Sequence, residues 1–163
     1  MAYCTECGTE LIMKEHPTEG VVPFCTKCEA YKWPGFNTAV SMVVLDHTRE
    51  HVLLIKQYGR PFYVLVAGYV NKGEDAEDAV VREVREELGL TVESICFNRS
   101  RFFAPSNTLM LNYTVTVSEE DPHPNWEIDD WQWFTVDEAR SSIKPHSLAE
   151  AFLNGFFDGV YRF

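Results

Sequence analysis

The sequence lacks any long apolar stretch and is poor in basic residues. No run approaches the roughly 18 apolar residues of a membrane-spanning helix, and the N-terminal residues do not combine a basic segment with an apolar run, as a secretion signal does. Lys and Arg number 14 against 25 Asp and Glu, which gives a net charge of −11. Such a charge disfavours nonspecific binding of nucleic acid, so any phosphate group would have to be bound locally, with the help of a metal ion. We therefore expect a soluble, cytoplasmic protein without a membrane partner.

Internal repeats and low-complexity tracts are also absent from the 163 residues. A chain of this length can bury one sizeable core, with a small appendage, but not two full domains. Residues 1–35 are too few and too polar to form a core alone, and Pro34 and Gly35 interrupt the chain where that segment ends. We therefore predict a small N-terminal domain at 1–35 and one main domain at 36–163.

Four of the five cysteines form two Cys-x-x-Cys pairs, Cys4 with Cys7 and Cys25 with Cys28. Pairs separated by seventeen residues are typical of a structural zinc site with four thiolate ligands, because each pair places two sulfurs on one turn. The metal would supply the folding free energy that burial cannot supply here. Two disulfides suit a reducing compartment poorly, and a redox Cys-x-x-Cys lacks its usual strand–helix context. Four sulfurs leave no coordination position for water, so we expect a structural zinc.

Apolar and β-branched runs make up much of residues 36–163, and one segment changes to a helical period. Val80, Val81, Val84 and Leu88 fall on one stripe of a predicted helix, which Gly89 would end in a left-handed conformation. The expected strands are 38–46, 52–57, 62–66, about 91–103, 108–118 and 128–135, and the expected helices are 75–88, 136–142 and 147 to about 159. This order predicts an α/β fold in which helices flank a mixed sheet, that is, an α/β/α sandwich.

The most specific pattern in the chain runs from Gly68 to Leu90. It reads G-x5-E-x7-R-E-U-x-E-E-x-G-U, where U is apolar. At about 6% usage for each fixed letter, chance would give all seven at about one starting position in 10⁸ to 10⁹. On a helix, Glu83, Glu86 and Glu87 at positions i, i+3 and i+4 occupy one sector of about 100°. Three carboxylates therefore crowd along one edge of the helix, beside its apolar stripe.

Carboxylates at this spacing repel one another by about 0.2 to 0.5 kcal/mol per pair. A hard divalent cation such as Mg²⁺ or Mn²⁺ would reverse this cost, because such ions prefer oxygen ligands. The alternative is a solvated charged face on which Arg82 offsets the repulsion. Gly68, Gly73 and Glu74 favour the metal site, since the glycines supply backbone freedom where the chain approaches a pyrophosphate, although either glycine also suits an ordinary turn.

This pattern is the Nudix box, and the chain resembles the Nudix hydrolases, a family that cleaves nucleoside diphosphates linked to another moiety. The resemblance implies a Nudix-type α/β/α sandwich with a catalytic Mg²⁺ or Mn²⁺ bound by Glu83, Glu86 and Glu87, together with the carbonyl of Ala67. Glu86 or Glu87 would orient or deprotonate the attacking water, so no covalent intermediate is needed. Arg82 would hold the carboxylates by ion pairing.

A four-cysteine ribbon directly before a Nudix domain is similar to the NADH pyrophosphatase branch of the family, over nearly the whole chain. Tyr69 occupies that branch's aromatic position, and Trp33, followed by proline, matches an aromatic–proline pair of its dinucleotide site. The segment E-I-D-D-W-Q-W-F beginning at Glu127 is similar to E-x-x-E-A-x-W-F, which implies that Glu127 is a further metal ligand or a general base. Ala149 falls where the branch makes a backbone contact with its substrate.

One stretch differs from that branch. Its signature S-Q-P-W-P-F-P-x-S-L-M is replaced at 100–110 by S-R-F-F-A-P-S-N-T-L-M, with three identities in eleven positions. Arg101 and Phe103 keep a cation and an aromatic ring near the expected site, able to contact phosphate and to stack on a base. We therefore predict relaxed choice among NAD(H), ADP-ribose, FAD and related dinucleotides.

Two alternatives remain open. In the first, the ribbon and the main domain form a binding module that recruits a nucleotide or RNA without turnover, although a pure sensor has no need for three adjacent carboxylates. In the second, the protein removes an NAD cap from RNA and the ribbon touches the transcript. The net charge of −11 disfavours the second alternative, but a short 5′ end needs few contacts. The family resemblance also implies a homodimer.

Overall fold

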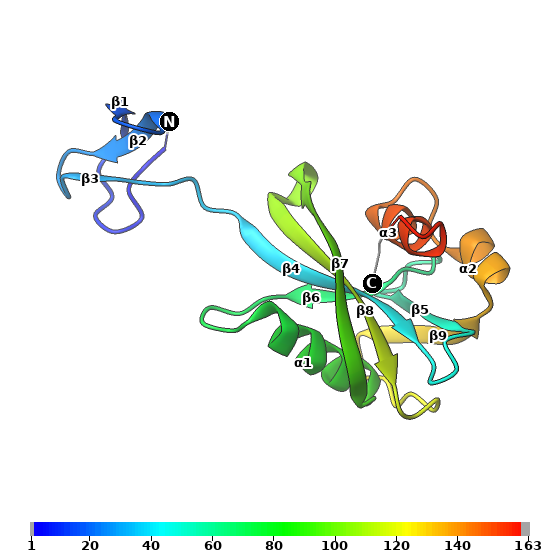
Figure 1. The fold of residues 1–163 in the computed structure, drawn as a ribbon. Coiled ribbons are helices and arrows are strands. Elements are labelled where there is room, and N and C mark those ends of the chain that lie inside the picture. The colour runs from blue at the N-terminus through cyan, green and yellow to red at the C-terminus, as the bar shows by residue number, and fades with distance from the viewer. Residues whose placement is uncertain (1, 161–163) are drawn as a thin grey trace. The chain divides into compact units, whose positions relative to one another are not determined.

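The computed structural model describes residues 2–160, shown as a ribbon in Figure 1. Contacts divide the chain into two compact units, one that ends at Phe36 and one that begins at Asn37. In residues 2–160, no helix is long and apolar enough to cross a membrane.

The first unit contains a three-stranded antiparallel sheet in the order β1-β2-β3. Its strands are β1 (Ile12–His16), β2 (Gly20–Cys25) and β3 (Ala30–Tyr31). Before β1, the backbone amide of Cys4 donates to the carbonyl of Thr9, and the amide of Gly8 donates to the carbonyl of Cys4, both at 2.8 Å. Gly8 has a φ of 72°, a conformation that glycine adopts without steric cost, so the chain turns tightly around the first cysteine pair.

The second unit is built on a six-stranded sheet with the order β7-β8-β4-β5-β9, in which β6 pairs with β4. The strands are β4 (Asn37–Leu45), β5 (Val52–Gln57), β6 (Val66–Tyr69), β7 (Val92–Phe103), β8 (Thr108–Val117) and β9 (Ile128–Phe134). β4 and β8 run parallel, whereas β4 pairs antiparallel with β5 and β6. The remaining ladders, β5 with β9 and β7 with β8, are also antiparallel. The sheet is therefore mixed.

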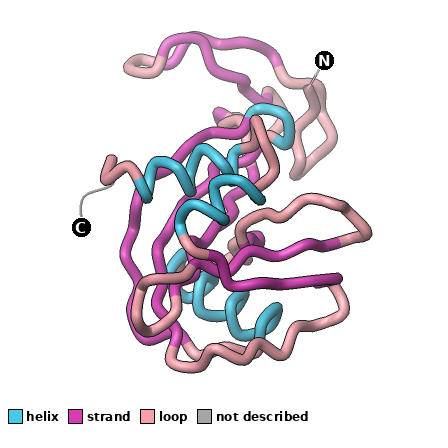
Figure 2. Tube along the Cα trace, turned by 90° about the vertical axis from the view of Figure 1, so that its right-hand side faces the viewer, coloured by secondary structure: helices cyan, strands magenta, loops and turns pink. Residues whose placement is uncertain are grey.

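Three helices cover the two faces of this sheet: α1 (Ala76–Leu88), α2 (Val136–Ser142) and α3 (Leu148–Phe157). Alternate residues of a strand point to opposite faces, and in β4 this sends Val40 and Met42 into the core beneath α1 but Val43 into the core beneath α2 and α3. Figures 1 and 2 show α1 on one side of the strands and the other two helices on the opposite side. The predicted α/β/α sandwich with a mixed sheet is confirmed.

The structure corrects the sequence-based prediction at two points. The strand expected at 62–66 lies instead at 66–69. Val64 pairs with Ile55 of β5 and Tyr63 pairs with Ile143, each as an isolated bridge and not as part of a ladder. Val81, which we placed on the apolar stripe of α1, is 41% exposed. It stands about 100° around the helix from Val80, so the buried stripe is narrower than predicted.

Candidate active site

The apolar stripe of α1 determines which face of the helix points to the core. Val80, Val84 and Leu88 are fully buried in the core, and Gly89 ends the helix with a φ of 69° and an amide hydrogen bond to the carbonyl of Arg85. Glu83, Glu86 and Glu87 then lie along the edge of that stripe. Glu87 is only 5% exposed, whereas the side chain of Glu86 is 59% exposed.

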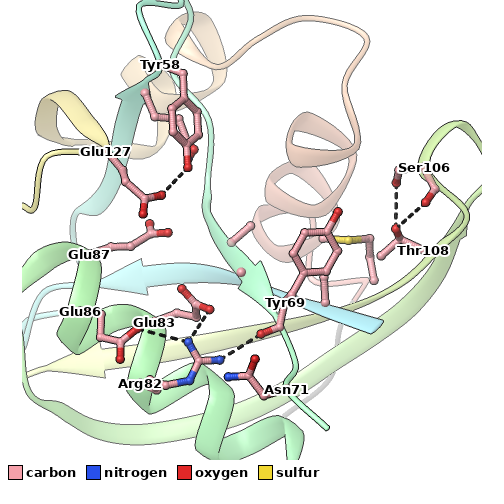
Figure 3. A pocket seen from close by; sticks show the side chains of 15 residues that line it. Tyr58, Tyr69, Asn71, Arg82, Glu83, Glu86, Glu87, Ser106, Thr108 and Glu127 are labelled. Atoms are coloured by element: carbon pink, nitrogen blue, oxygen red, sulfur yellow. Dashed lines mark hydrogen bonds and ion pairs between the residues drawn. The ribbon is translucent and has the colours of Figure 1, made fainter. Parts of the chain in front are cut away.

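Arg82 ties the loop before α1 to the helix. Its guanidinium forms a bidentate pair with Glu74, at 2.6 Å from Nε and 2.9 Å from Nη2, and Nη2 also donates to the carbonyl of Tyr69 at 2.9 Å. Its Nη1 donates to Glu83 at 2.6 Å and to Glu86 at 3.3 Å. Hydrogen bonding to Arg82 lowers the pKa of Glu74 to about 2. The predicted ion pairing between Arg82 and the carboxylates is therefore present (Figure 3).

Gly68 is needed for close approach rather than for a turn. It lies in β6, paired with Val40 of β4, one residue before that strand ends at Tyr69. A Cβ atom at this position would lie 1.9 Å from Cδ of Glu83, a distance that forces the carboxylate to move. The absence of a side chain at Gly68 thus lets Glu83 reach across the strand. Gly73, with a φ of 85°, does occupy the turn that the sequence predicted.

Glu127 is carried by a loop that is attached to the end of α1. The amide of His123 donates to the carbonyl of Leu88 at 2.7 Å, and the amide of Asn125 donates to the carbonyl of Glu87 at 3.0 Å. The side chain of Asn125 accepts the amide of Glu127 at 2.9 Å. Carbonyls at a helix C-terminus need such partners. The same bonds place Glu127 beside Glu87, although the two residues are far apart in the sequence.

The Glu87 carboxylate is the unusual group of the site. Desolvation by burial raises its pKa to about 8, and the negative charges of Glu83, Glu127 and Glu86 add to the effect. No residue in the described part of the chain donates a hydrogen bond to its Oε2 atom. Figure 3 shows the Glu87 and Glu127 side chains next to each other at the cavity. A buried carboxylate that lacks a donor and faces another carboxylate fits a divalent cation, which supplies the missing positive charge.

These groups line an open cavity of about 500 Å³. Its walls are formed by Ala39, Gln57, Tyr58, Ala67, Gly68, Tyr69, Asn71, Arg82, Glu83, Glu86, Glu87, Ser106, Thr108, Met110 and Glu127. A smaller hollow of about 200 Å³ shares Gln57, Ala67 and Met110 with it and is also lined by Ala149. The cavity therefore gathers Glu83, Glu86, Glu87 and Glu127, together with Ala67, and Ala149 lies in the hollow beside it.

The predicted substrate-binding residues Tyr69, Arg101, Phe103 and Trp33 lie in different surroundings. Tyr69 is 59% exposed and lines the cavity. Arg101 and Phe103 stand at the end of β7 and are exposed, and the cavity wall near them is made by Ser106, Thr108 and Met110 instead. Trp33 belongs to the first unit, where its ring packs edge-on against His16 at 5.6 Å.

The four-cysteine cluster lies in the first unit. The sulfurs of Cys4, Cys7, Cys25 and Cys28 all lie within 4.8 Å of one another, and they are the one group of three or more metal-binding side chains gathered this closely in residues 2–160. Hydrogen bonding to Thr9 lowers the pKa of Cys7 to about 6. Hydrogen bonding to the sulfurs of Cys7 and Cys25 raises the pKa of Cys28 to about 12. Four converging sulfurs are a donor set that could bind zinc.

Sequence reasoning missed several lining residues, among them Tyr58, Asn71 and Ser106. Asn71 belongs to the loop inside the Gly68–Leu90 pattern, at a position that the pattern leaves unspecified. Its backbone amide donates to the carboxylate of Glu74 at 2.8 Å. Tyr58 follows β5 and reaches the site through strand pairing, so no local sequence signal marks it.

A mixed-sheet sandwich that carries three glutamates of one helix at a cavity wall has the arrangement of a metal-dependent hydrolase. The model of the NUDIX domain matches residues 35–153. The chain therefore belongs to the Nudix family.

Relatives and solved structures agree with this assignment. The chain is 34% identical over 154 residues to a protein of Pseudomonas aeruginosa named NAD-capped RNA hydrolase NudC, covering 90% of this chain and 54% of the relative. It is 26% identical to a protein of the same name from Vibrio parahaemolyticus, covering 94% and 58%. The chain thus spans about half the length of these relatives.

Two solved structures show the same fold. A NUDIX hydrolase from Nitrosomonas europaea superposes with a TM-score of 0.70 at 20% identity, covering 98% of this chain and 94% of that one. The NUDIX domain of NrtR from Shewanella oneidensis, solved with ADP ribose, superposes with a TM-score of 0.62 at 17% identity, covering 84% and 92%.

Proposed function

We propose that this chain hydrolyses the diphosphate linkage of a nucleoside diphosphate derivative, with NAD(H), ADP-ribose and FAD as the first substrates to test. The observation that carries the proposal is the Glu87 carboxylate, buried without a hydrogen-bond donor from the described residues at the wall of a cavity of about 500 Å³. Burying an unpaired carboxylate costs folding free energy. A bound cation would offset that cost and would also bind a diphosphate.

Glu83, Glu86, Glu87 and Glu127 would hold the divalent cation, Mg²⁺ or Mn²⁺, with the carbonyl of Ala67. When bound, the cation would neutralise part of the diphosphate charge and stabilise the charge that develops during cleavage. Arg82 keeps Glu83 and Glu86 oriented through its hydrogen bonds.

In the proposed reaction, the oxygen of a water molecule bonds to one phosphorus as the bridging phosphorus–oxygen bond breaks. Glu86 or Glu87 accepts a proton from that water, and the bridging oxygen leaves with the other phosphate. Tyr69, with its ring exposed in the cavity, would stack on a base, while Arg101, Phe103, Trp33 and Ala149 stay predicted contacts to the remainder of the substrate.

Glu87→Gln tests this proposal, because it preserves the shape of the side chain but removes its charge. We expect folding to be retained and hydrolysis to be lost. The assay is a chromatographic screen of dinucleotides with Mg²⁺ or Mn²⁺, with products identified by mass. NMN plus AMP would assign NAD(H), and ribose 5-phosphate plus AMP would assign ADP-ribose. Turnover that survives in both Glu86→Gln and Glu87→Gln would refute the proposed metal site.

Removal of an NAD cap from RNA is a second candidate, favoured by the name of the relatives from Pseudomonas and Vibrio. The net charge of −11 limits it to a short 5′ end. Competition between free NAD and an NAD-capped RNA oligomer separates the two substrates. A preference for the oligomer that disappears when the RNA nucleotides after the cap are removed would favour RNA. A nucleotide- or RNA-binding module without turnover would bind the same ligands and release no product.

The organisation of the chain completes the proposal. We propose a zinc ribbon at 1–35, in which Cys4, Cys7, Cys25 and Cys28 hold a structural Zn²⁺, and a Nudix hydrolase domain at 36–163. A homodimer and a cytoplasmic location stay predictions from the family resemblance.

A further inference from the structure

Tyr58 contacts the site from the turn that follows β5, outside the Gly68–Leu90 pattern. Its hydroxyl donates a hydrogen bond to Oε2 of Glu127, and the residue, 56% exposed, lines the same cavity as Glu83 and Glu87. Figure 3 shows this bond on the side of the cavity opposite Arg82. Two glutamates of the site are thus held by Arg82, and Glu127 is held by Tyr58.

The backbone around Tyr58 is shaped for this contact. Tyr58 has a φ of 55° and Gly59 a φ of 65°, and a left-handed conformation is unfavourable for a residue with a bulky side chain. The turn is fixed on the partner strand, because the amide of Gly59 donates to Oδ2 of Asp129 at 2.6 Å. The amide of Tyr58 also donates to the carbonyl of Glu127 at 3.4 Å.

The partner strand has a matching irregularity. Lys56 pairs with Asp130, but Gln57 pairs with Ile128, so the register shifts and Asp129 is the extra residue. Such bulges re-aim side chains and are frequent beside active sites. Here the shift allows Glu127 and Asp129, on either side of Ile128, both to accept hydrogen bonds from the turn at Tyr58 and Gly59.

We propose that Tyr58 is a positioning residue that holds the Glu127 carboxylate beside Glu87, so that both can bind one divalent cation. This inference rests on the proposed function, because it takes Glu127 as a ligand of that cation. The hydroxyl occupies Oε2 of Glu127 and leaves Oε1 available. Partners that orient a metal ligand in this way typically change metal affinity by about 10- to 100-fold when they are removed.

The test is Mn²⁺ binding to the zinc-replete full chain, measured from the electron paramagnetic resonance signal of free Mn²⁺. We expect Tyr58→Phe to lower the affinity about tenfold, with little change in melting temperature. Tyr63→Phe is the matched control, since its hydroxyl also donates to a carboxylate of the β9 strand, Asp130, at 2.8 Å. Tyr63 does not line the cavity, so its replacement should leave the affinity for Mn²⁺ unchanged.

A double-mutant cycle identifies the route of the effect. If Tyr58 acts through Glu127, Tyr58→Phe should cause no further loss of Mn²⁺ affinity in the Glu127→Gln background. Wild-type affinity in Tyr58→Phe, an equal loss in Tyr63→Phe, or additive losses in the cycle would each overturn the inference. An unfolded Tyr58→Phe protein would also overturn it, because the loss of one hydroxyl from a half-exposed ring should not unfold the chain.

Glu87→Gln separates this inference from the proposed function. If the wild type does not bind Mn²⁺, or if Glu87→Gln binds it as tightly as the wild type does, the proposed metal site is wrong. If Glu87→Gln abolishes binding but Tyr58→Phe leaves it intact, the proposed function stands and the role of Tyr58 falls.

Discussion

Glu87→Gln should stabilise the protein when Mg²⁺ and Mn²⁺ are absent, although it should abolish hydrolysis. Desolvation and three neighbouring carboxylates raise the pKa of Glu87 from 4.5 to about 8. Each unit of pKa corresponds to about 1.4 kcal/mol, so at neutral pH this group costs the folded state about 3 kcal/mol relative to an unfolded chain in which it ionises freely. The amide of glutamine also needs hydrogen-bond partners, so we expect a net gain of about 1 to 3 kcal/mol.

The sign of the pH dependence follows from the direction of the shift. Above about pH 4.5 the unfolded chain releases the Glu87 proton, whereas the folded protein keeps it up to about pH 8. The wild type therefore loses stability as the pH rises through this interval, and the advantage of Glu87→Gln grows over the same interval. The assay is urea unfolding, followed by circular dichroism, on zinc-replete protein without added Mg²⁺ or Mn²⁺.

Glu86→Gln is the control, because the Glu86 side chain is 59% exposed and its replacement should change stability by less than about 0.5 kcal/mol. Added Mn²⁺ should stabilise the wild type but not Glu87→Gln, which would narrow the difference between them. A Glu87→Gln protein that is less stable than the wild type without Mn²⁺, or a difference that does not grow with pH, would refute the reasoning.

Three further outcomes are expected. Gly68→Ala should lower Mn²⁺ affinity and turnover at least about tenfold, because a Cβ there would lie 1.9 Å from Cδ of Glu83; wild-type kinetics in this variant would contradict it. His51→Gln should destabilise the protein more at pH 6 than at pH 9, since hydrogen bonding to Asp46 raises the pKa of His51, so the stabilisation is complete below the unfolded pKa and is lost as the pH rises through the folded pKa; urea unfolding at both values checks this. Cys28→Ser, or zinc chelation, should unfold the first unit and leave the second folded; an amide NMR spectrum without loss of the first unit's dispersed signals would count against a structural metal.

The part of the site that could be predicted from sequence is the part that one helix carries. Helical spacing alone brings Glu83, Glu86 and Glu87 to one edge of α1, and this holds wherever the helix packs. The helix period also predicted the buried stripe, except that Val81 was included, because apolar character does not reveal how wide the covered sector is.

The part that sequence could not predict depends on strand pairing. Glu127 was proposed from family resemblance, and its place beside Glu87 results from the hydrogen bonds of His123 and Asn125 to the end of α1. Tyr58 reaches Glu127 only because β5 pairs with β9. The strand expected at 62–66 was wrong in a related way: its composition favours a strand, but Tyr63 and Val64 form only isolated bridges, to Ile143 and Ile55.

Under the proposed function, the charge of the cavity would make substrate binding depend on the metal. Arg82 is the single cationic side chain among the described residues that line it, and its hydrogen bonds are committed to Glu74, Glu83, Glu86 and the carbonyl of Tyr69. A diphosphate therefore meets four glutamates and no uncommitted lining cation. Coulomb repulsion between a diphosphate and these carboxylates would be large in a partly buried site. The proposed divalent cation would therefore contribute to binding of the diphosphate as well as to its cleavage, so removal of the cation should weaken substrate affinity and not turnover alone.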